Sequence, residues 1–298
     1  MNTAAISHNN LPLATVLRQV LGLFKLRIGV VIAFTALAGL AVSPGPALPA
    51  WKIALLGLAV LLSSAAAGAF NQYVESDVDG RMKRTRNRPF VTGALPRTRA
   101  WLWLILALVG VAVGAAWWAL NPWAALYTFL GAFFYAVVYT VWLKRRTWLN
   151  IVFGGLAGSF AVLAGAASVD PAIGAVPLIL SLVLFLWTPP HFWSLAIAYR
   201  KDYEVARIPM LPVVVGDARA AQVILLHTTL LVAISLVPVF LGLGRVYFAG
   251  AAIGGAWFLA TSWRLVRYPG AKTAMSNFHA SLAQLTLLLV SATLDAAL

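Results

Sequence analysis

Apolar stretches of about 20 residues recur along the whole chain, and no other feature of the sequence constrains the fold as strongly. A helix of that length rises about 30 Å, which matches the hydrocarbon thickness of a bilayer. Hydrophobic residues make up 62% of the chain and charged residues only 10%, whereas about a quarter of residues are charged in soluble domains. We therefore predict an all-α integral membrane protein with about nine transmembrane helices. The expected spans are Ile28–Leu48, Ile53–Gln72, Ala100–Leu120, Trp123–Leu143, Leu149–Val169, Pro171–Ala198, Ala220–Leu241, Val246–Trp263 and Phe278–Leu294.

The chain is expected to hold one transmembrane domain, residues 28–298, behind a cytoplasmic lead of residues 1–27. The apolar residues between Val16 and Phe24 allow a short interfacial helix in this lead, although a disordered lead is equally compatible with the sequence. The lead shows neither a signal-peptide pattern nor the Arg-rich and Ser-rich composition of an organelle transit peptide. We therefore expect a bacterial cell inner membrane as the location.

The basic residues predict the orientation in the membrane. All but Lys52 and Arg245 of the 22 Lys and Arg residues fall in the N-terminal lead and in alternate connections between spans. Because Lys and Arg are enriched in cytoplasmic loops, these connections are expected in the cytoplasm. Nine spans then place the N-terminus in the cytoplasm and the C-terminus in the periplasm.

Composition excludes several kinds of site. The chain has no cysteine, so disulfides, thiolate metal sites and cysteine nucleophiles are excluded. The four histidines are too scattered for a zinc pattern. The formal net charge of +14 follows alternate loops, so membrane orientation explains it and no nucleic-acid partner is expected.

Acidic residues are concentrated in two cytoplasmic connections. Six of the eight Asp and Glu residues follow the second and sixth spans, in the same connections as many basic residues. Acidic residues contribute little to membrane topology, so orientation does not explain them. These two connections are therefore the best candidates for a functional site.

The first connection begins with oxygen-bearing side chains at helical spacing. Asn71, Glu75 and Asp79 form one stripe if the second span continues as a helix, while Asp77 points elsewhere. Such a stripe suits Mg²⁺, which typically binds one or two carboxylates together with substrate phosphates. The alternative is a solvated helix end whose acids pair with neighbouring Arg residues.

The second connection follows a span that contains two adjacent prolines. Pro189 and Pro190 are expected to break this span. His191 comes directly afterwards, and three roles remain open for it: a ligand of iron, a proton shuttle, or a bond to a freed carbonyl. Asp202 lies at a span exit that resembles the first one, so both acidic ends could share one Mg²⁺ cluster. The alternative is an exposed acid balanced by Lys201.

Several short motifs together resemble one known family. They extend from about Lys25 to Gly216. The chain resembles the UbiA-type intramembrane prenyltransferases, and among them the heme O synthase (protoheme IX farnesyltransferase) branch. The motifs are Asn71-x-x-x-Glu75-x-x-x-Asp79, Arg86-Asn87-Arg88-Pro89 with Thr92-Gly93, Tyr139 with Lys144-Arg145-Arg146, Asn150-Ile151-Val152-Phe153-Gly154-Gly155, Pro190-His191-Phe192, and Asp202-Tyr203 leading to Ile208-Pro209-Met210-Leu211-Pro212.

The resemblance implies a helical bundle with a central cavity open toward the cytoplasm, and a reaction between two substrates in the membrane lipid. A farnesyl group passes from farnesyl diphosphate to a vinyl of heme b, water is added, and heme O and diphosphate are released. The resemblance also implies a heme A synthase as a possible downstream partner. The implied metal ligands, for Mg²⁺, are Asn71, Glu75, Asp79 and Asp202.

The resemblance also gives roles to further side chains. Tyr139 would shield the allylic cation, and His191 would contact the heme. The residues implied in binding diphosphate or heme propionate are Arg81, Lys83, Arg86, Arg88, Lys144, Arg145, Lys201 and Tyr203.

Two departures from the family pattern stand out. The wider superfamily has a second Asp-x-x-x-Asp motif, but Ala206 stands four residues after Asp202. The expected metal role of Asp202 is therefore weaker than those of Glu75 and Asp79. Near the N-terminus, Leu26 stands between Lys25 and Arg27 where the family commonly has proline, which changes only how the first span is expected to begin.

Two other functions remain open at this point. A prenyltransferase of the same fold could act on a quinone precursor or a chlorin, although Glu75 and the Pro190-His191-Phe192 motif are more typical of the heme branch. A secondary transporter is a more distant alternative. Transporters normally place acidic residues near the bilayer midplane, whereas all eight here lie in connections or at span ends.

Overall fold

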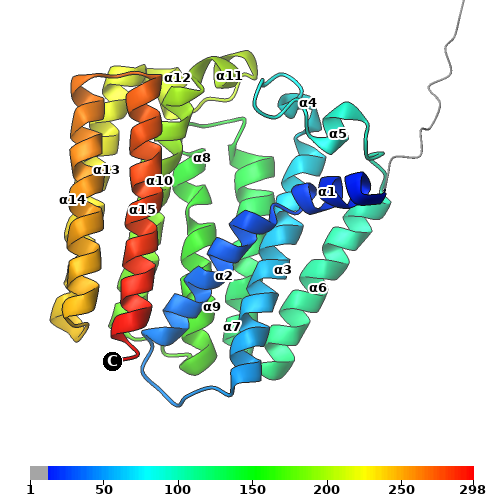
Figure 1. Cartoon of the computed structure of the whole chain (residues 1–298). Coiled ribbons are helices and arrows are strands. Elements are labelled where there is room, and N and C mark those ends of the chain that lie inside the picture. Colours follow the sequence, from blue (N-terminus) through cyan, green and yellow to red (C-terminus); the bar gives the residue numbers. More distant parts are fainter. Residues whose placement is uncertain (1–12) are drawn as a thin grey trace, which may run out of the picture.

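Long apolar helices run side by side through the described part of the chain, residues 13–298 of the computed structural model (Figure 1). No strand occurs within these residues. The long helices are α2 (Leu26–Ala41), α3 (Ala50–Val74), α6 (Ala100–Ala119), α7 (Pro122–Phe133) continued by the π-helix η1 (Phe134–Leu143), α9 (Leu156–Val169), α10 (Ala175–Ala198), α13 (Asp217–Ser235), α14 (Arg245–Arg267) and α15 (Ala271–Asp295). The short helices are α1 (Leu13–Leu23), α4 (Ser76–Asp79), α5 (Pro89–Thr92), α8 (Asn150–Gly154), α11 (Arg200–Val205), α12 (Leu211–Val215) and the 3₁₀ turn η2 (Val237–Leu241).

The all-α membrane architecture agrees with the prediction. Within residues 13–298, seven helical segments are long and apolar enough to cross a membrane, and the bent pair α1 and α2 makes an eighth. Helix α14 occupies the position of the remaining predicted span but is not among these segments. The count of nine therefore stays a prediction.

The predicted lead contains helix α1, which meets α2 at a bend of 46°. Lys25 stands at this bend with a φ of 48°, a left-handed conformation that is uncommon for a residue other than glycine. Residues 1–12 of the lead lie outside the described residues.

Two expectations about the helices are wrong, and both involve proline residues. The first span was expected to reach Leu48, but α2 ends at Ala41 because Pro44, Pro46 and Pro49 follow closely and cannot continue a helix. The expected break at Pro189 and Pro190 is wrong, since α10 runs unbroken through both residues. Helix α10 packs against α9, α13 and α15, and these neighbours stabilise it as one continuous helix although the two prolines donate no backbone hydrogen bonds.

Small residues allow α2 and α9 to pack very closely. A Cβ atom added to Gly165 would collide with the carbonyl oxygen of Ala36, and one added to Gly39 would collide with that of Val162. Close approach of backbones through small residues is a common way for membrane helices to associate, because lipid provides no hydrophobic drive between helices. This contact fixes the second half of α2, whereas the start of α2 borders the candidate site described below.

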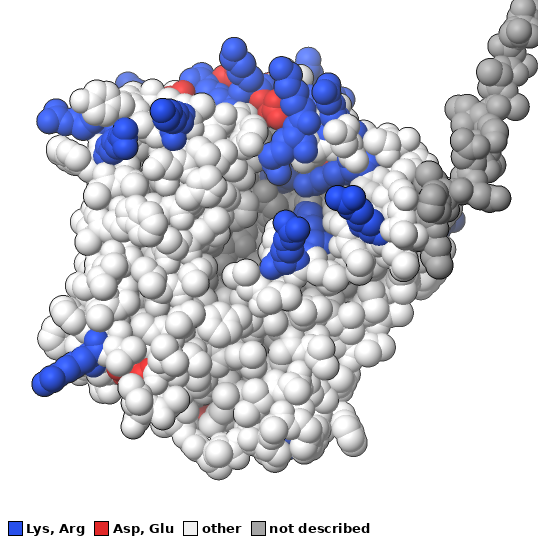
Figure 2. Space-filling view, in the orientation of Figure 1, with Lys and Arg blue, Asp and Glu red and all other residues white. Residues whose placement is uncertain are grey.

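Charged side chains gather at one end of the bundle. Figure 2 shows Lys and Arg residues over the end that carries α4, α5, α11 and α12, and around a hollow just below it. The opposite end carries few charges in this view. The hollow marks the entrance to the candidate site.

Candidate active site

A cavity of about 680 Å³ lies beneath the charged end of the bundle. Residues from α1, α2, α3, α4, η1, α10 and α11, together with the loop before α5, form its walls. Apolar side chains, including Ile28, Phe192 and Leu195, stand beside the polar ones. Its charged and other polar side chains include Arg18, Gln19, Lys25, Asn71, Gln72, Glu75, Asp79, Arg84, Asn87, Arg88, Tyr135, Tyr139, Lys144 and Tyr203.

The predicted stripe of oxygen ligands lines this cavity, although the helix that carries it is not continuous. Helix α3 ends at Val74, and Glu75 joins it to α4. The backbone nitrogens of Glu75 and Asp79 still donate to the carbonyl oxygens four residues earlier, at 3.0 and 2.8 Å. Asn71, Glu75 and Asp79 therefore keep a common face, and they are buried, with exposed fractions of 2%, 1% and 3%.

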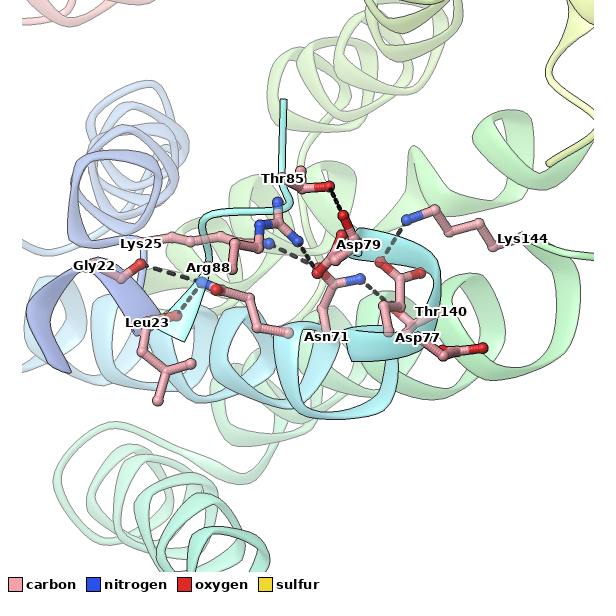
Figure 3. A network of polar contacts seen from close by, with 12 residues as sticks. Gly22, Leu23, Lys25, Asn71, Asp77, Asp79, Thr85, Arg88, Thr140 and Lys144 are labelled. Atoms are coloured by element: carbon pink, nitrogen blue, oxygen red, sulfur yellow. Dashed lines mark hydrogen bonds and ion pairs between the residues drawn. The ribbon is translucent and has the colours of Figure 1, made fainter. Parts of the chain in front are cut away.

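Each member of the stripe is held by a different cationic side chain (Figure 3). Lys144 Nζ lies 2.5 Å from Glu75 Oε2, and Arg88 Nη1 lies 2.6 Å from Asp79 Oδ2. Lys25 Nζ donates to Asn71 Oδ1 at 2.8 Å. From the sequence, acids paired with basic residues were expected only as an alternative to metal binding. The structure shows the ion pairs, and metal binding at the same side chains stays a prediction.

Second contacts fix the orientation of the ligand side chains. The amide nitrogen of Asn71 donates to Thr140 Oγ1 at 3.2 Å, and Thr140 in turn donates to the carbonyl oxygen of Tyr135 at 2.8 Å. These bonds leave the Asn71 oxygen turned toward Lys25. The hydroxyl of Thr85 donates to the carbonyl oxygen of Asp79 at 2.9 Å, which pins the end of α4. Such outer contacts typically hold metal ligands in place.

One carboxylate oxygen has no partner among the described residues. Glu75 Oε1 is buried and receives no hydrogen bond. Burying such an oxygen costs free energy unless a donor or a cation compensates it. No cluster of three or more His, Cys, Asp or Glu residues with metal-binding geometry occurs within residues 13–298. Mg²⁺ nevertheless needs only one or two carboxylates plus phosphate oxygens, so Glu75, Asp79 and Asn71 fit this ion.

Two tyrosines form the opposite wall of the cavity. Tyr135 and Tyr139 lie on η1 with their rings stacked at 5.7 Å between centroids. Lys25 lies over the first ring at 5.8 Å and Lys144 over the second at 5.5 Å. Tyr139 was predicted from the sequence and Tyr135 was missed, although its position four residues earlier in the same span was the available signal.

Helix α1 forms a further wall, which the sequence analysis did not anticipate. The side-chain amide of Gln72 donates to the carbonyl oxygens of Gly22 and Leu23 at 3.1 and 2.9 Å, and so caps the end of α1. Arg18 and Lys25 then reach the cavity from this side. Lys25 entered the sequence analysis only as a departure from a family motif, and nothing in its spacing to Asn71 reveals their contact.

Several predicted site residues lie outside the cavity lining. Asp202 Oδ2 accepts a hydrogen bond from the backbone nitrogen of Arg84 at 3.2 Å, and buried Ala206 lies one turn further. Its neighbour Tyr203 is buried and does line the cavity. The fourth ligand role of Asp202 stays a prediction. The exposed basic residues of this group are Arg81, Lys83, Arg86, Arg145 and Lys201.

Asp77 points away from the cavity, as predicted, and holds Arg145 outside it. Both guanidinium nitrogens of Arg145 donate to the two oxygens of Asp77, at 2.7 and 2.9 Å. This pair is about half exposed. The hydrogen bond from Arg145 holds the pKa of the Asp77 carboxyl below its ordinary value of 3.8.

His191 is buried between aromatic rings and does not line the cavity. Its ring stacks on Trp187 at 4.2 Å and on Phe278 at 4.4 Å between centroids. Its Nδ1 lies 2.7 Å from the hydroxyl of Ser281 on α15. The next residue, Phe192, lines the cavity instead. A heme contact by His191 therefore stays a prediction, and it requires this stack to open.

Comparison with known proteins adds relatives of assigned activity. Residues 32–288 match the UbiA prenyltransferase family. Protoheme IX farnesyltransferase 2 of Paramagnetospirillum magneticum is 56% identical over 275 residues, covering 92% of this chain and 96% of that protein. Protoheme IX farnesyltransferase 1 of the same organism is 48% identical over 280 residues, covering 93% and 98%.

Solved structures share the fold at much lower sequence identity. A structure from a study of digeranylgeranylglyceryl phosphate synthase in membranes has a TM-score of 0.77 at 17% identity, covering 94% of this chain and 98% of that one. A UbiA homolog from Archaeoglobus fulgidus bound to DMAPP and Mg²⁺ has a TM-score of 0.68 at 16% identity, covering 91% and 99%. At these identities the likeness establishes the fold alone.

Proposed function

Because the chain belongs to the UbiA prenyltransferase family, we propose that it transfers a farnesyl group from farnesyl diphosphate to a vinyl group of heme b. Water supplies a hydroxyl group, and the products are heme O and diphosphate. The observation that carries this proposal is the 56% identity, over nearly the whole length of both chains, with a protoheme IX farnesyltransferase. A cavity with buried carboxylates and surrounding cations suits a diphosphate substrate.

The reaction balances with water as the third reactant. The bond between C1 of the farnesyl group and the diphosphate oxygen breaks, and its electron pair leaves with diphosphate. C1 of the allylic cation then bonds to the terminal vinyl carbon. The positive charge that forms next to the porphyrin ring is taken up by water, which loses a proton and becomes the hydroxyl group.

The side chains that line the cavity suit the first of these steps. Negative charge develops on the departing diphosphate, and Arg88 and Lys144 stabilise it because both guanidinium and ammonium groups face the cavity. The rings of Tyr135 and Tyr139 shield the allylic cation through their negative faces. Phe192 and Leu195 offer an apolar wall for the isoprenoid chain.

A bound Mg²⁺ would be held by Asn71, Glu75 and Asp79. When present, the ion neutralises charge on the leaving diphosphate. The partnerless oxygen of Glu75 supports this role, and so does the solved structure of an Archaeoglobus fulgidus UbiA homolog with DMAPP and Mg²⁺. Asp202 is a proposed fourth ligand that would have to reach the cavity from its rim.

The exposed basic residues above the cavity suit the propionate groups of heme. Heme b carries two carboxylates, and basic side chains crowd the end of the bundle where the cavity opens (Figure 2). We assign this role to Arg81, Lys83, Arg86 and Lys201, which lie exposed at this end. Heme O would pass from this site to a heme A synthase.

The orientation in a bacterial inner membrane is also a proposal. It rests on the gathering of basic residues at the end with the cavity, which we place in the cytoplasm, with the C-terminus in the periplasm. The chain has no cysteine, so single cysteines can report topology directly. A cysteine at Arg81 is expected to react with an impermeant maleimide only after cell lysis, and one at Leu298 in intact spheroplasts. The reverse pattern would contradict the orientation.

A product assay tests the function. The purified protein in detergent is incubated with heme b, farnesyl diphosphate and Mg²⁺, with and without chelator, and the products are analysed by mass spectrometry. The expected product is heme that has gained one farnesyl group and one water, and it disappears on chelation. If folded protein gives no such adduct but prenylates a quinone precursor or a chlorin, the acceptor assignment is wrong and only the reaction class remains.

A further inference from the structure

The cavity carries more positive than negative charge. Two acidic side chains and five basic ones line it. Three of the basic residues, Lys25, Arg88 and Lys144, are already in contact with the side chains that we propose as metal ligands. They come from three separate elements: the junction of α1 and α2, the loop before α5, and the end of η1.

Each of these cations contacts a side chain that a metal ion would also need, and Lys25 holds the single side-chain oxygen of Asn71. Lys144 lies against Glu75 Oε2, Arg88 against Asp79 Oδ2 and Lys25 against Asn71 Oδ1 (Figure 3). A divalent ion at these oxygens repels neighbouring ammonium and guanidinium groups at such short distances. The metal and the three cations are therefore competitors for one set of oxygens unless an anion enters with the metal.

Diphosphate is such an anion. It carries about three negative charges near neutral pH and offers several strong acceptor oxygens. The three cations already stand around the cavity, so a small movement of each side chain toward a bound diphosphate would free the ligand oxygens. This exchange would exclude free metal from the resting site and admit metal together with diphosphate.

We propose that Lys25, Arg88 and Lys144 hold the metal-ligand oxygens in the resting protein and transfer to the diphosphate when the metal–diphosphate complex binds. This inference rests on the proposed function, because it takes a prenyl diphosphate as the substrate. Lys25 is the member that the sequence did not reveal. It binds the side-chain oxygen of Asn71 in the resting protein and binds the diphosphate once the substrate has entered.

Lys25 is the most readily released of the three. Its two partners are neutral, since its ammonium donates to the amide oxygen of Asn71 and lies 3.3 Å from the hydroxyl of Tyr135. Arg88 and Lys144 are each bound to a carboxylate and so are held more strongly. Lys25 therefore supplies a positive charge that has no anionic partner in the resting cavity.

The exchange makes a specific thermodynamic prediction about two ligands. In the resting protein the metal competes with the cations, so metal alone binds weakly, and diphosphate strengthens metal binding. By reciprocity, metal strengthens diphosphate binding by the same factor. Removal of the Lys25 charge is expected to strengthen binding of metal alone while it weakens the binding of diphosphate. A merely structural lysine would weaken both.

Mn²⁺ binding, followed by electron paramagnetic resonance of the purified protein in detergent, tests this inference. Titrations are made with and without inorganic diphosphate for the wild type, Lys25→Met, Lys25→Gln and Lys25→Arg. Lys52→Met, at the opposite end of α3, is the matched control. Thermal unfolding identifies any variant that does not fold, and Lys25→Arg keeps the charge if the uncharged variants fail.

We expect Lys25→Met and Lys25→Gln to bind Mn²⁺ alone several-fold more tightly than the wild type and to lose at least tenfold in diphosphate affinity. Lys25→Arg is expected to restore most of the coupling, and Lys52→Met to match the wild type. Unchanged or weaker binding of Mn²⁺ alone in the folded uncharged variants overturns the exchange. The exchange is also overturned if the Mn²⁺ affinity of the wild-type protein does not depend on diphosphate.

The same samples separate this inference from the proposed function. If Mn²⁺ and diphosphate binding are coupled as expected but the product assay gives no heme adduct, the exchange is supported and heme is rejected as the acceptor. A heme adduct with no coupling between Mn²⁺ and diphosphate retains the function and rejects the exchange.

Discussion

The two acidic cytoplasmic segments look alike in the sequence, and the structure separates them. In the first segment, Glu75 and Asp79 are buried in the cavity wall, and each is paired with a cation. In the second, Asp202 remains at the rim and accepts a hydrogen bond from the backbone of Arg84. Two motifs of similar composition are therefore not equivalent, because the fold buries one pair of carboxylates in the cavity wall and leaves Asp202 outside the lining.

The preceding helices do not cause the difference, because both continue their backbone hydrogen bonds across a junction of one residue. Glu75 joins α3 to α4, and Tyr199 joins α10 to α11. The backbone nitrogens of Tyr199 and Tyr203 donate to the carbonyl oxygens four residues earlier, at 3.0 and 3.3 Å. What differs is the residue that lines the cavity: in α11 it is Tyr203 and not Asp202, so the second segment contributes an aromatic ring and no carboxylate.

The largest effect is expected from neutralising the first segment. Glu75→Gln or Asp79→Asn should lower kcat by about 10²–10³-fold, because each change removes an anionic ligand and leaves a cation without its partner. Turnover to the heme adduct measures the effect. Glu204→Gln, in an exposed pair with Arg200 on α11, serves as the control. Near-normal turnover in either variant removes that carboxylate from the mechanism.

A smaller effect is expected from the second segment. Asp202→Asn should lower turnover by about tenfold, since its carboxylate positions the loop that carries Arg84 without lining the cavity. Measurement of kcat against Mg²⁺ concentration distinguishes the roles. A loss as large as that of Asp79→Asn, with a raised Mg²⁺ requirement, would show that Asp202 is a metal ligand and that the two segments act together.

Substitution of His191 tests whether α10, the helix before the second segment, contributes a heme contact or only packing. His191→Ala should destabilise the protein by about 2 kcal/mol, because it empties the space between Trp187 and Phe278. The structure predicts that the absorption spectrum of bound heme stays the same, since His191 does not reach the cavity. His191→Phe, which refills the aromatic stack, is the companion variant. A shifted heme spectrum in both would restore the heme contact that the sequence predicted.

The smallest effect is expected at the exposed member of the first segment. Arg145→Met should cost about 0.5 kcal/mol or less, because its pair with Asp77 is about half exposed. The Asp77 pKa is lowered by folding, so this stabilisation is present above its ordinary pKa of 3.8 and disappears as the pH falls through the folded-state value. Thermal unfolding of the wild type and the variant should converge in acid. A large loss of turnover would instead give Arg145 the substrate contact that the sequence predicted.

The sequence by itself determined the membrane architecture and the stripe of oxygen-bearing side chains that lines the cavity. Runs of apolar residues require helices in a bilayer, because lipid cannot satisfy an unpaired backbone. The spacing of Asn71, Glu75 and Asp79 placed them on one face, because side chains four residues apart in a helix lie one above the other. The prolines of α10 were misjudged, because their effect depends on how neighbouring helices pack. The prolines after α2 were overlooked, although their effect is local and could be read from the sequence.

Tertiary structure alone decided which distant residues meet. The contact between Lys25 and Asn71 spans 46 residues of sequence, and that between Lys144 and Glu75 spans 69. No local period encodes such pairs, because they depend on the bend between α1 and α2 and on the course of η1. For the same reason Asp202 and His191, which the sequence placed with the site, lie beside it in the folded protein. Local spacing fixes which side chains share a helix face, and only packing determines what that face meets.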